Sequence, residues 1–361
     1  MERTNGRSEM NAGDFQVGIV GKGKMGTSLF GYLLDFEFPL VWVCKNKNDV
    51  EELEKQVRKR WTRTFRAGLI DRDRYENRLN QIRVSHLTQK LAQCNLIIET
   101  ITEDLRLKRE LFETLDRVTN NDCIFASCSS SIPPEDWYAN GNRKDKVVGM
   151  HFFYPVPFAN IVELIITRNT SRQTLQNSRL FLNHMNKQFI FQQGESAFLL
   201  NRVFLDFQAG AYQLCKENNL SFKEMDDLIV KDFFPVGVFE FFDRVGIDVI
   251  HNAINRYTKN AKNREFFQPL LNHLGKMVRE NRLGMKTAHG FYSWEAQQRI
   301  IPGNNSNKSS IGACYGSIKE RLKGWYVNAA TRFVEQGYCT KEELTFGVKE
   351  YMNCDKGPFE I

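Results

Sequence analysis

The feature that most constrains the fold of this chain is a glycine-rich turn, GKGKMG at residues 21–26, which directly follows the apolar segment 15–20. In such a turn Gly21 permits a tight bend, Gly23 lets the backbone approach a pyrophosphate, and Gly26 allows a helix to pack closely on the strand. The start of that helix also offers amide groups and a positive dipole end to phosphates. The sequence therefore predicts a dinucleotide site that contains Gly21, Gly23, Lys24, Met25 and Gly26.

The end of the second predicted strand lacks the acidic residue that such sites usually carry. Cys44 occupies this position, and Lys45 follows it. A carboxylate there would bind the 2′-hydroxyl of the adenine ribose and repel a 2′-phosphate. Cysteine does neither, and a lysine can attract the phosphate. Both NAD and NADP therefore remain open as the cofactor, with Cys44 and Lys45 at its site.

Short apolar segments alternate with helical stretches through the first half of the chain, which is typical of a parallel sheet covered by helices. We expect strands at 15–20, 40–44, 82–85, 96–99, 123–127, 147–151, 161–166 and 188–191. A helical segment at 49–81 should contain a turn near Ala67-Gly68. From about residue 197 helical periodicity dominates. The predicted fold is an α/β Rossmann-type domain followed by an all-α domain.

We predict four segments: an NAD(P)-binding domain at 1–195, a helical substrate and dimerisation domain at 196–300, a linker at 301–317 and a partial second helical repeat at 318–361. The linker contains PGNNSNKSS, which is too poor in apolar residues to offset chain entropy. The repeat rests on the order of motifs, because Gly-x-Phe-Glu ends both 207–240 and 326–360. Chance similarity between two amphipathic helices is the alternative.

Charge and cysteine usage limit the classes of partner. The net charge is +7, but the basic clusters at 58–60 and 63–66 are interleaved with apolar residues at helical spacing, which indicates an exposed helix face rather than a nucleic-acid site. The eight cysteines form no CxxC pair and have no zinc-like spacing with histidine. We therefore expect no metal site and a reducing, cytoplasmic location. The polar first fourteen residues and the lack of a long apolar run predict no signal peptide and no membrane span.

Four polar residues further along the chain are candidates for catalysis. His151 and Glu163 lie at the two ends of one short segment, where a histidine and a carboxylate can form a general base and its orienting partner. Ser130 belongs to a cluster of serines at 127–131, and Asn201 lies near the start of the predicted helical domain. Each also has a structural interpretation, such as a core histidine or a turn serine.

With these motifs in order, the chain resembles the 3-hydroxyacyl-CoA dehydrogenases, including the 3-hydroxybutyryl-CoA type. The resemblance runs from about residue 16 to 294. It rests on the glycine turn and on ETITED at 99–104, FASCSS at 125–130, HFFYPVP at 151–157 with Glu163, LNR at 200–202, FPVGVFE at 234–240, and GMKT at 284–287 with GFY at 290–292. It implies an all-α domain like the C-terminal domain of 6-phosphogluconate dehydrogenase, and a homodimer.

The resemblance implies a role for each candidate. His151 matches the base that takes the hydroxyl proton as hydride leaves for the nicotinamide, and Glu163 matches the carboxylate that stabilises the imidazolium. Ser130 and Asn201 match residues that hold the reacting part of the substrate. Glu103 and Lys108 match residues near the nicotinamide ribose. The implied activity is NAD(P)-dependent interconversion of a 3-hydroxyacyl thioester and its 3-oxoacyl form, as in fatty acid metabolism.

Some positions depart from the family pattern. Tyr154 and Cys128 replace asparagines, and Ser196-Ala197 replaces a Pro-Gly pair. Ala67 aligns with a lysine that helps to hold the coenzyme A phosphate. These departures leave the acyl carrier open between coenzyme A and an acidic acyl-carrier protein. They also leave two alternatives: a non-catalytic dinucleotide-binding or regulatory homologue, and a dehydrogenase of a free hydroxy acid.

Overall fold

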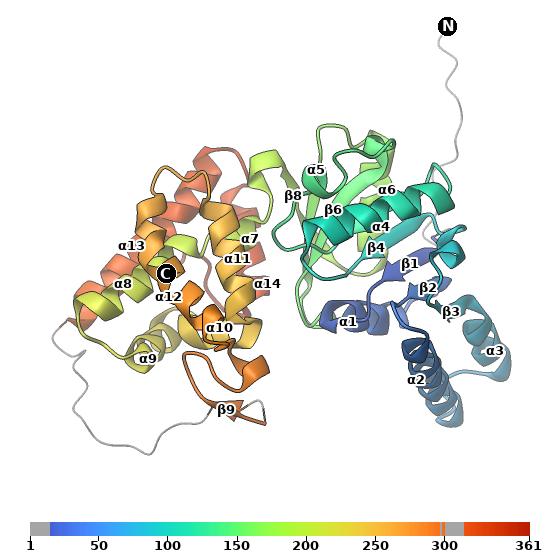
Figure 1. Cartoon of the computed structure of the whole chain (residues 1–361), viewed down its shortest axis with the longest axis horizontal. Helices are drawn as coiled ribbons and strands as arrows, with labels where there is room; N and C mark the ends of the chain where they lie inside the picture. Colours follow the sequence, from blue (N-terminus) through green and yellow to red (C-terminus); the bar gives the residue numbers. More distant parts are fainter. Residues whose placement is uncertain (1–14, 297, 300–313) are drawn as a thin grey trace, which may run out of the picture. The chain divides into compact units, whose positions relative to one another are not determined.

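The computed structural model describes residues 15–296, 298–299 and 314–361, and the chain divides into two compact units, Met1–Ala197 and Phe198–Ile361 (Figure 1). Each unit is described by itself below. The polar N-terminus and most of the predicted linker lie outside the described residues. Among the described residues, no helix combines the length and the apolar character needed to cross a membrane.

The first unit is built on a sheet whose strands follow the order β3-β2-β1-β4-β5-β6-β7-β8. Neighbours are parallel from β3 through β6, β7 is antiparallel to β6, and β8 is parallel to β7. The strands are β1 (Val17–Val20), β2 (Leu40–Val43), β3 (Ile82–Ser85), β4 (Leu96–Glu99), β5 (Ile124–Ser127), β6 (Val147–Phe152), β7 (Ile161–Ile166) and β8 (Gln188–Gln193). The structure confirms all eight predicted strands and the Rossmann-type fold.

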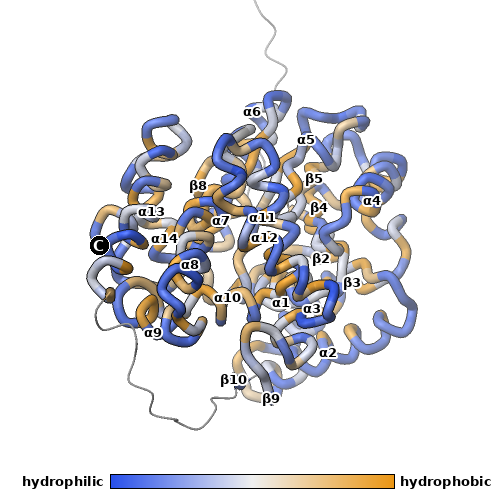
Figure 2. The backbone as a smooth tube through the Cα atoms, turned by 60° about the vertical axis from the view of Figure 1, so that its left-hand side comes forward, coloured by the Kyte–Doolittle hydropathy of each residue, from blue (hydrophilic) through white to orange (hydrophobic). Residues whose placement is uncertain are grey.

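Helices cover both faces of this sheet: α1 (Lys24–Leu33), α2 (Lys47–Arg66), α3 (Arg72–Gln81), α4 (Leu105–Val118), α5 (Pro134–Trp137) and α6 (Arg172–His184). One apolar cluster packs Leu29 of α1 and Phe181 of α6 against the strands, and another packs Phe112 of α4. The predicted turn after α2 is confirmed, because Gly68 has a φ of +70°. The polar character of α2 is visible in Figure 2, as expected for an exposed basic helix.

The second unit is almost wholly helical. It contains α7 (Leu199–Arg202), α8 (Leu205–Glu217), α9 (Phe222–Asp232), α10 (Val238–Val245), α11 (Ile247–Thr258), α12 (Arg264–Arg279), α13 (Tyr315–Glu335) and α14 (Lys341–Met352). The structure adds a short hairpin of β9 (Trp294–Glu295) and β10 (Gln298–Arg299). This hairpin was not predicted, because strands of two residues are too short to give an alternating pattern in the sequence.

The tail of the chain packs on the first helix pair of this unit. A Cβ atom added at Gly210 of α8 would lie 2.1 Å from the ring of Trp325 in α13, so the two helices are in close contact. Phe204 stacks on Tyr326 with ring centroids 5.5 Å apart. The tail thus forms a helix pair in the order that the repeat hypothesis expects, although the repeat itself stays a prediction.

Candidate active site

The glycine turn between β1 and α1 has a geometry that other residues would disturb. Gly21 has a φ of +120°, and a Cβ atom there would lie 2.7 Å from Oγ1 of Thr100. A Cβ atom at Gly26 would lie 2.3 Å from the carbonyl oxygen of Gly21. The indole nitrogen of Trp42 donates to this same carbonyl at 2.8 Å. The turn is therefore packed tightly on its inner side.

Gly23 occupies the opposite, open side of the turn. A Cβ atom there would have only the carbonyl oxygen of Thr100 within 4.0 Å. Gly23 is also the N-cap of α1, and having no side chain it cannot cap the first helical amides. A pyrophosphate needs this combination of room for close approach and unfilled amide donors. The turn fits a dinucleotide, with Lys24 and Met25 at the start of the helix.

The end of β2 carries no carboxylate of its own, although acidic residues lie near the turn. Cys44 is buried, and its thiol lies 3.6 Å from the carbonyl oxygen of Ser85. Burial raises the pKa of this thiol, so it stays neutral. Lys45 is exposed beside it. Asp49 and Glu52 of α2 are engaged by Lys22, whose ammonium lies 3.0 and 2.6 Å from their carboxylates.

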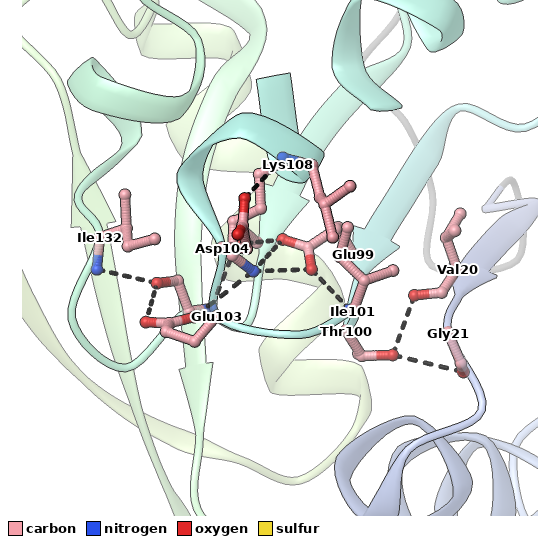
Figure 3. A network of polar contacts seen from close by, with 12 residues as sticks. Val20, Gly21, Glu99, Thr100, Ile101, Glu103, Asp104, Lys108 and Ile132 are labelled. Carbon is pink, nitrogen blue, oxygen red and sulfur yellow. Dashed lines mark hydrogen bonds and ion pairs between the residues drawn. The ribbon is translucent and has the colours of Figure 1, made fainter. Parts of the chain in front are cut away.

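A buried ion pair lies at the end of β4, next to the glycine turn (Figure 3). The ammonium of Lys108 donates to both oxygens of Glu99 at 2.8 Å, and both side chains are almost fully buried. Ser127 and the amide of Ile101 also donate to Glu99, each at 2.6 Å. Burial raises the pKa of Glu99, and Lys108 opposes this shift. The pair joins β4 to α4 under the edge where the strands end.

Glu103 holds the serine turn that follows β5. Its Oε1 accepts from the hydroxyls of Ser129 and Ser131 at 2.6 and 2.8 Å, and from the amide of Ser131 at 2.9 Å. Burial alone would raise the pKa of Glu103, but Lys108 at 3.5 Å and these donors bring it below its usual value. Glu103 is thus an anion that shapes the turn containing Ser130. The predicted contact of Glu103 and Lys108 with a nicotinamide ribose stays a prediction.

His151 and Glu163 form the hydrogen bond that a base and its orienting carboxylate require. They are direct partners in the antiparallel register of β6 and β7, which places their side chains on one face of the sheet. Nδ1 of His151 lies 2.6 Å from Oε2 of Glu163, and both side chains are buried. Because a carboxylate only accepts, Nδ1 of His151 is the donor in this hydrogen bond, and Nε2 is the ring nitrogen that does not face Glu163.

Phe153 packs against the His151 ring, with centroids 4.5 Å apart.

The segment after β6 is held in place by Lys187, a buried lysine. Its ammonium donates to the carbonyl oxygens of Val156 and Ala159 at 2.6 and 2.7 Å. Tyr154, one of the departures from the family pattern, is 59% exposed. This departure therefore leaves the buried His151–Glu163 pair intact.

The candidate residues fall into both units. Ser130 lies on the serine turn at the carboxyl end of β5, next to β6 with His151. Asn201 lies in α7 of the second unit, where its amide donates to the hydroxyl of Tyr257 at 3.3 Å. Two further residues of the site were not predicted from the sequence: Glu99, and Gln192, whose amide donates to Glu163.

The sheet order and the glycine turn define a Rossmann-type fold, and His151 and Glu163 form a buried histidine–carboxylate pair within it. The NAD binding domain of 3-hydroxyacyl-CoA dehydrogenase matches residues 16–195, and the C-terminal domain of 3-hydroxyacyl-CoA dehydrogenase matches residues 198–294. The chain therefore belongs to the 3-hydroxyacyl-CoA dehydrogenase family. This confirms the resemblance found in the sequence.

Individual relatives agree with this assignment. The mitochondrial hydroxyacyl-coenzyme A dehydrogenase of Sus scrofa is 29% identical over 77% of this chain and 91% of its own. The 3-hydroxybutyryl-CoA dehydrogenase of Clostridioides difficile is 27% identical over 77% of this chain and 99% of its own. The crystal structure of 3-hydroxybutyryl-CoA dehydrogenase from Escherichia coli K12 shares the fold, with a TM-score of 0.77 and 17% identity over 95% of this chain and 90% of that one. The comparisons favour neither the non-catalytic alternative nor the free hydroxy acid.

Proposed function

We propose that this protein interconverts a 3-hydroxyacyl thioester and its 3-oxoacyl form, with His151 as the general base. The observation that carries the proposal is the 2.6 Å contact between His151 and the buried Glu163. Nε2 of His151 takes the proton of the substrate hydroxyl, and Glu163 stabilises the imidazolium that results. A dinucleotide held by the glycine turn at 21–26 would supply the nicotinamide that takes the hydride from C3 while the hydroxyl becomes a carbonyl. Ser130 forms a hydrogen bond with the reacting oxygen of the substrate, and Asn201 binds the same part of the substrate.

The test is spectrophotometric. Purified protein is mixed with NADH or NADPH and an acetoacetyl thioester, and oxidation of the cofactor is followed by absorbance. We expect turnover with at least one of the two cofactors. Protein that binds neither cofactor and produces no absorbance change contradicts the proposal.

The same assay compares acyl carriers, which are coenzyme A and a carrier protein in this proposal. Arg63 and Arg66 of α2 are exposed, whereas Arg60 is engaged by Asp35 and the carbonyl oxygen of Gly31. The exposed pair supports binding of a phosphate of coenzyme A or of an acidic carrier protein. A higher kcat/KM for acetoacetyl-CoA than for an acetoacetyl carrier protein identifies coenzyme A as the carrier, and the reverse ratio identifies the protein.

We further propose that Cys44 relaxes the choice between NAD and NADP. Cys44→Asp restores a carboxylate that can bind the ribose 2′-hydroxyl and repel a 2′-phosphate. We expect the ratio of the Kd for NADPH to the Kd for NADH to rise about tenfold, since a hydrogen bond to a charged group contributes about 1.5–3 kcal/mol. Fluorescence titration measures both constants. Cys44→Ser is the matched control, and an equal ratio in the aspartate variant argues against this role.

A dimer formed through the helical unit is a further part of the proposal, and the tail bears on it. Because α13 covers α8 around Gly210 and Phe204, removing residues 302–361 exposes apolar surface. We expect the truncated protein to be less soluble or to form a larger oligomer in analytical ultracentrifugation. An unchanged sedimentation profile and melting temperature would count against this.

The proposed cytoplasmic location is supported by the cysteines, which are free thiols.

A further inference from the structure

We infer that Gln192 is a positioning residue for catalysis, acting through Glu163; the inference rests on the proposed role of the His151–Glu163 pair. Nε2 of Gln192 lies 2.6 Å from Oε1 of Glu163, and the Gln192 side chain is buried. Glu163 therefore has a hydrogen-bond partner on each oxygen, His151 on Oε2 and Gln192 on Oε1. The three side chains form a chain from amide to carboxylate to imidazole.

The sheet register accounts for this arrangement. Glu163 of β7 pairs with His151 of β6 on one side and with Ile190 of β8 on the other. Gln192 lies two residues beyond Ile190 and therefore points to the same face as Glu163. It pairs with Ile165, which lies two residues further from the start of β7 than Glu163. Gln192 thus approaches the carboxylate diagonally, from the side that lies further from the carboxyl end of β6 than His151.

A second donor on Glu163 has a specific mechanical effect. The terminal torsion of a glutamate is broad, so one hydrogen bond leaves the plane of the carboxylate free to turn. With His151 on Oε2 and Gln192 on Oε1, the plane is fixed, and so is the direction in which the imidazole points. An accurately held base is what proton transfer requires, because small displacements of a catalytic group reduce the rate strongly.

The amide is also the right chemical type for this position. A buried carboxylate needs donors to offset its desolvation. A lysine or arginine at 192 would supply them, but its positive charge would oppose formation of the imidazolium on His151. A neutral amide satisfies Oε1 and leaves the negative charge of Glu163 to stabilise the proton taken from the substrate. The group facing Glu163 is the NH₂ end, since a carbonyl oxygen there would repel the carboxylate.

The test is Gln192→Met, which keeps the length of the side chain and removes the donor. We expect kcat with acetoacetyl-CoA and NADH to fall about tenfold, equal to about 1.4 kcal/mol of activation free energy. The KM for the thioester and the Kd for NADH should change less than about twofold, because the residue acts on the base rather than on binding. Gln188→Met is the matched control, an exposed glutamine on the same strand, and should retain the wild-type kcat.

A double-mutant cycle separates positioning from a general structural effect. In a Glu163→Gln background, Gln192→Met should lower kcat by less than about twofold, because its route to His151 is already broken. An equal loss in both backgrounds, or a wild-type kcat in the single variant, overturns the inference. If Gln192→Met does not fold, Gln192→Asn replaces it: its amide is one carbon too short to reach Glu163, and the same loss of kcat is expected. A normal kcat in Glu163→Gln alone instead refutes the proposed catalytic pair.

Discussion

Replacing His151 by glutamine should lower kcat about 10³-fold in both directions, because no group then takes the hydroxyl proton in the oxidation or returns it to the C3 oxygen in the reduction of acetoacetyl-CoA. General-base catalysis contributes roughly 10²- to 10⁴-fold to the rate of a reaction. Glutamine fills a similar volume and can still hydrogen-bond to Glu163, so the fold should persist. The glycine turn follows β1, whereas His151 lies in β6, and the Kd for NADH should therefore stay within about twofold of the wild-type value.

Steady-state kinetics with acetoacetyl-CoA and fluorescence titration with NADH measure the two quantities. His86→Gln is the matched control, since His86 is exposed after β3 and should tolerate the change without loss of rate. A His151→Gln variant that keeps more than about a tenth of the wild-type kcat would exclude His151 as the base. A large loss of NADH affinity would instead indicate that the substitution disturbs the cofactor site.

Local patterns were sufficient to predict much of the fold and part of the site. Short apolar segments predicted the buried strands, and residues 21–26 alone were sufficient to predict the glycine turn. His151 and Glu163 lie twelve residues apart on neighbouring antiparallel strands, so one hairpin brings them together. A short sequence separation of this kind is what made their pairing predictable.

The partners that lie far apart in sequence were missed. Gln192 belongs to the segment QFIFQQ of β8, where an alternating pattern would favour burying the phenylalanines. The structure does the opposite at its end, with Phe191 39% exposed and Gln192 buried. The buried carboxylate of Glu163 is the reason, because a hydrogen-bond donor on that face stabilises it. Single-sequence periodicity carries no information about a partner 29 residues away.

Lys108 illustrates a different limit. The family resemblance implies that it lies near the nicotinamide ribose, which stays a prediction; the ion pair that it forms with the buried Glu99, with Glu103 3.5 Å away, was not predicted. A lysine in the first turn of an amphipathic helix is usually predicted to be exposed. Here the helix start lies against the end of β4, and the carboxylate of Glu99 draws the ammonium inward. Burial of this lysine follows from the sheet topology rather than from the helix sequence.

This buried pair makes Lys108→Met the substitution with the largest expected effect on stability. Methionine fills the space of the lysine stem but leaves the carboxylate of Glu99 buried without its cation. Breaking such a pair costs about 3–5 kcal/mol, and for a unit of this size the melting temperature should fall by about 10 °C. Thermal unfolding followed by circular dichroism measures the change. Arg106→Met is the matched control, since it removes an exposed ion pair with Glu110 on the same helix, and such pairs contribute about 1 kcal/mol or less.

The dependence on pH and a compensating variant identify the cause of this loss. Burial raises the pKa of Glu99, and removing Lys108 raises it further. A carboxyl group whose pKa is raised on folding adds stability at low pH and loses it as the pH rises through the folded-state pKa. The deficit of Lys108→Met relative to wild type should therefore be larger at about pH 8 than at about pH 5. Adding Glu99→Gln removes the orphaned charge and should restore most of the melting temperature at about pH 8; a double variant no more stable than Lys108→Met would show that the loss comes from packing instead.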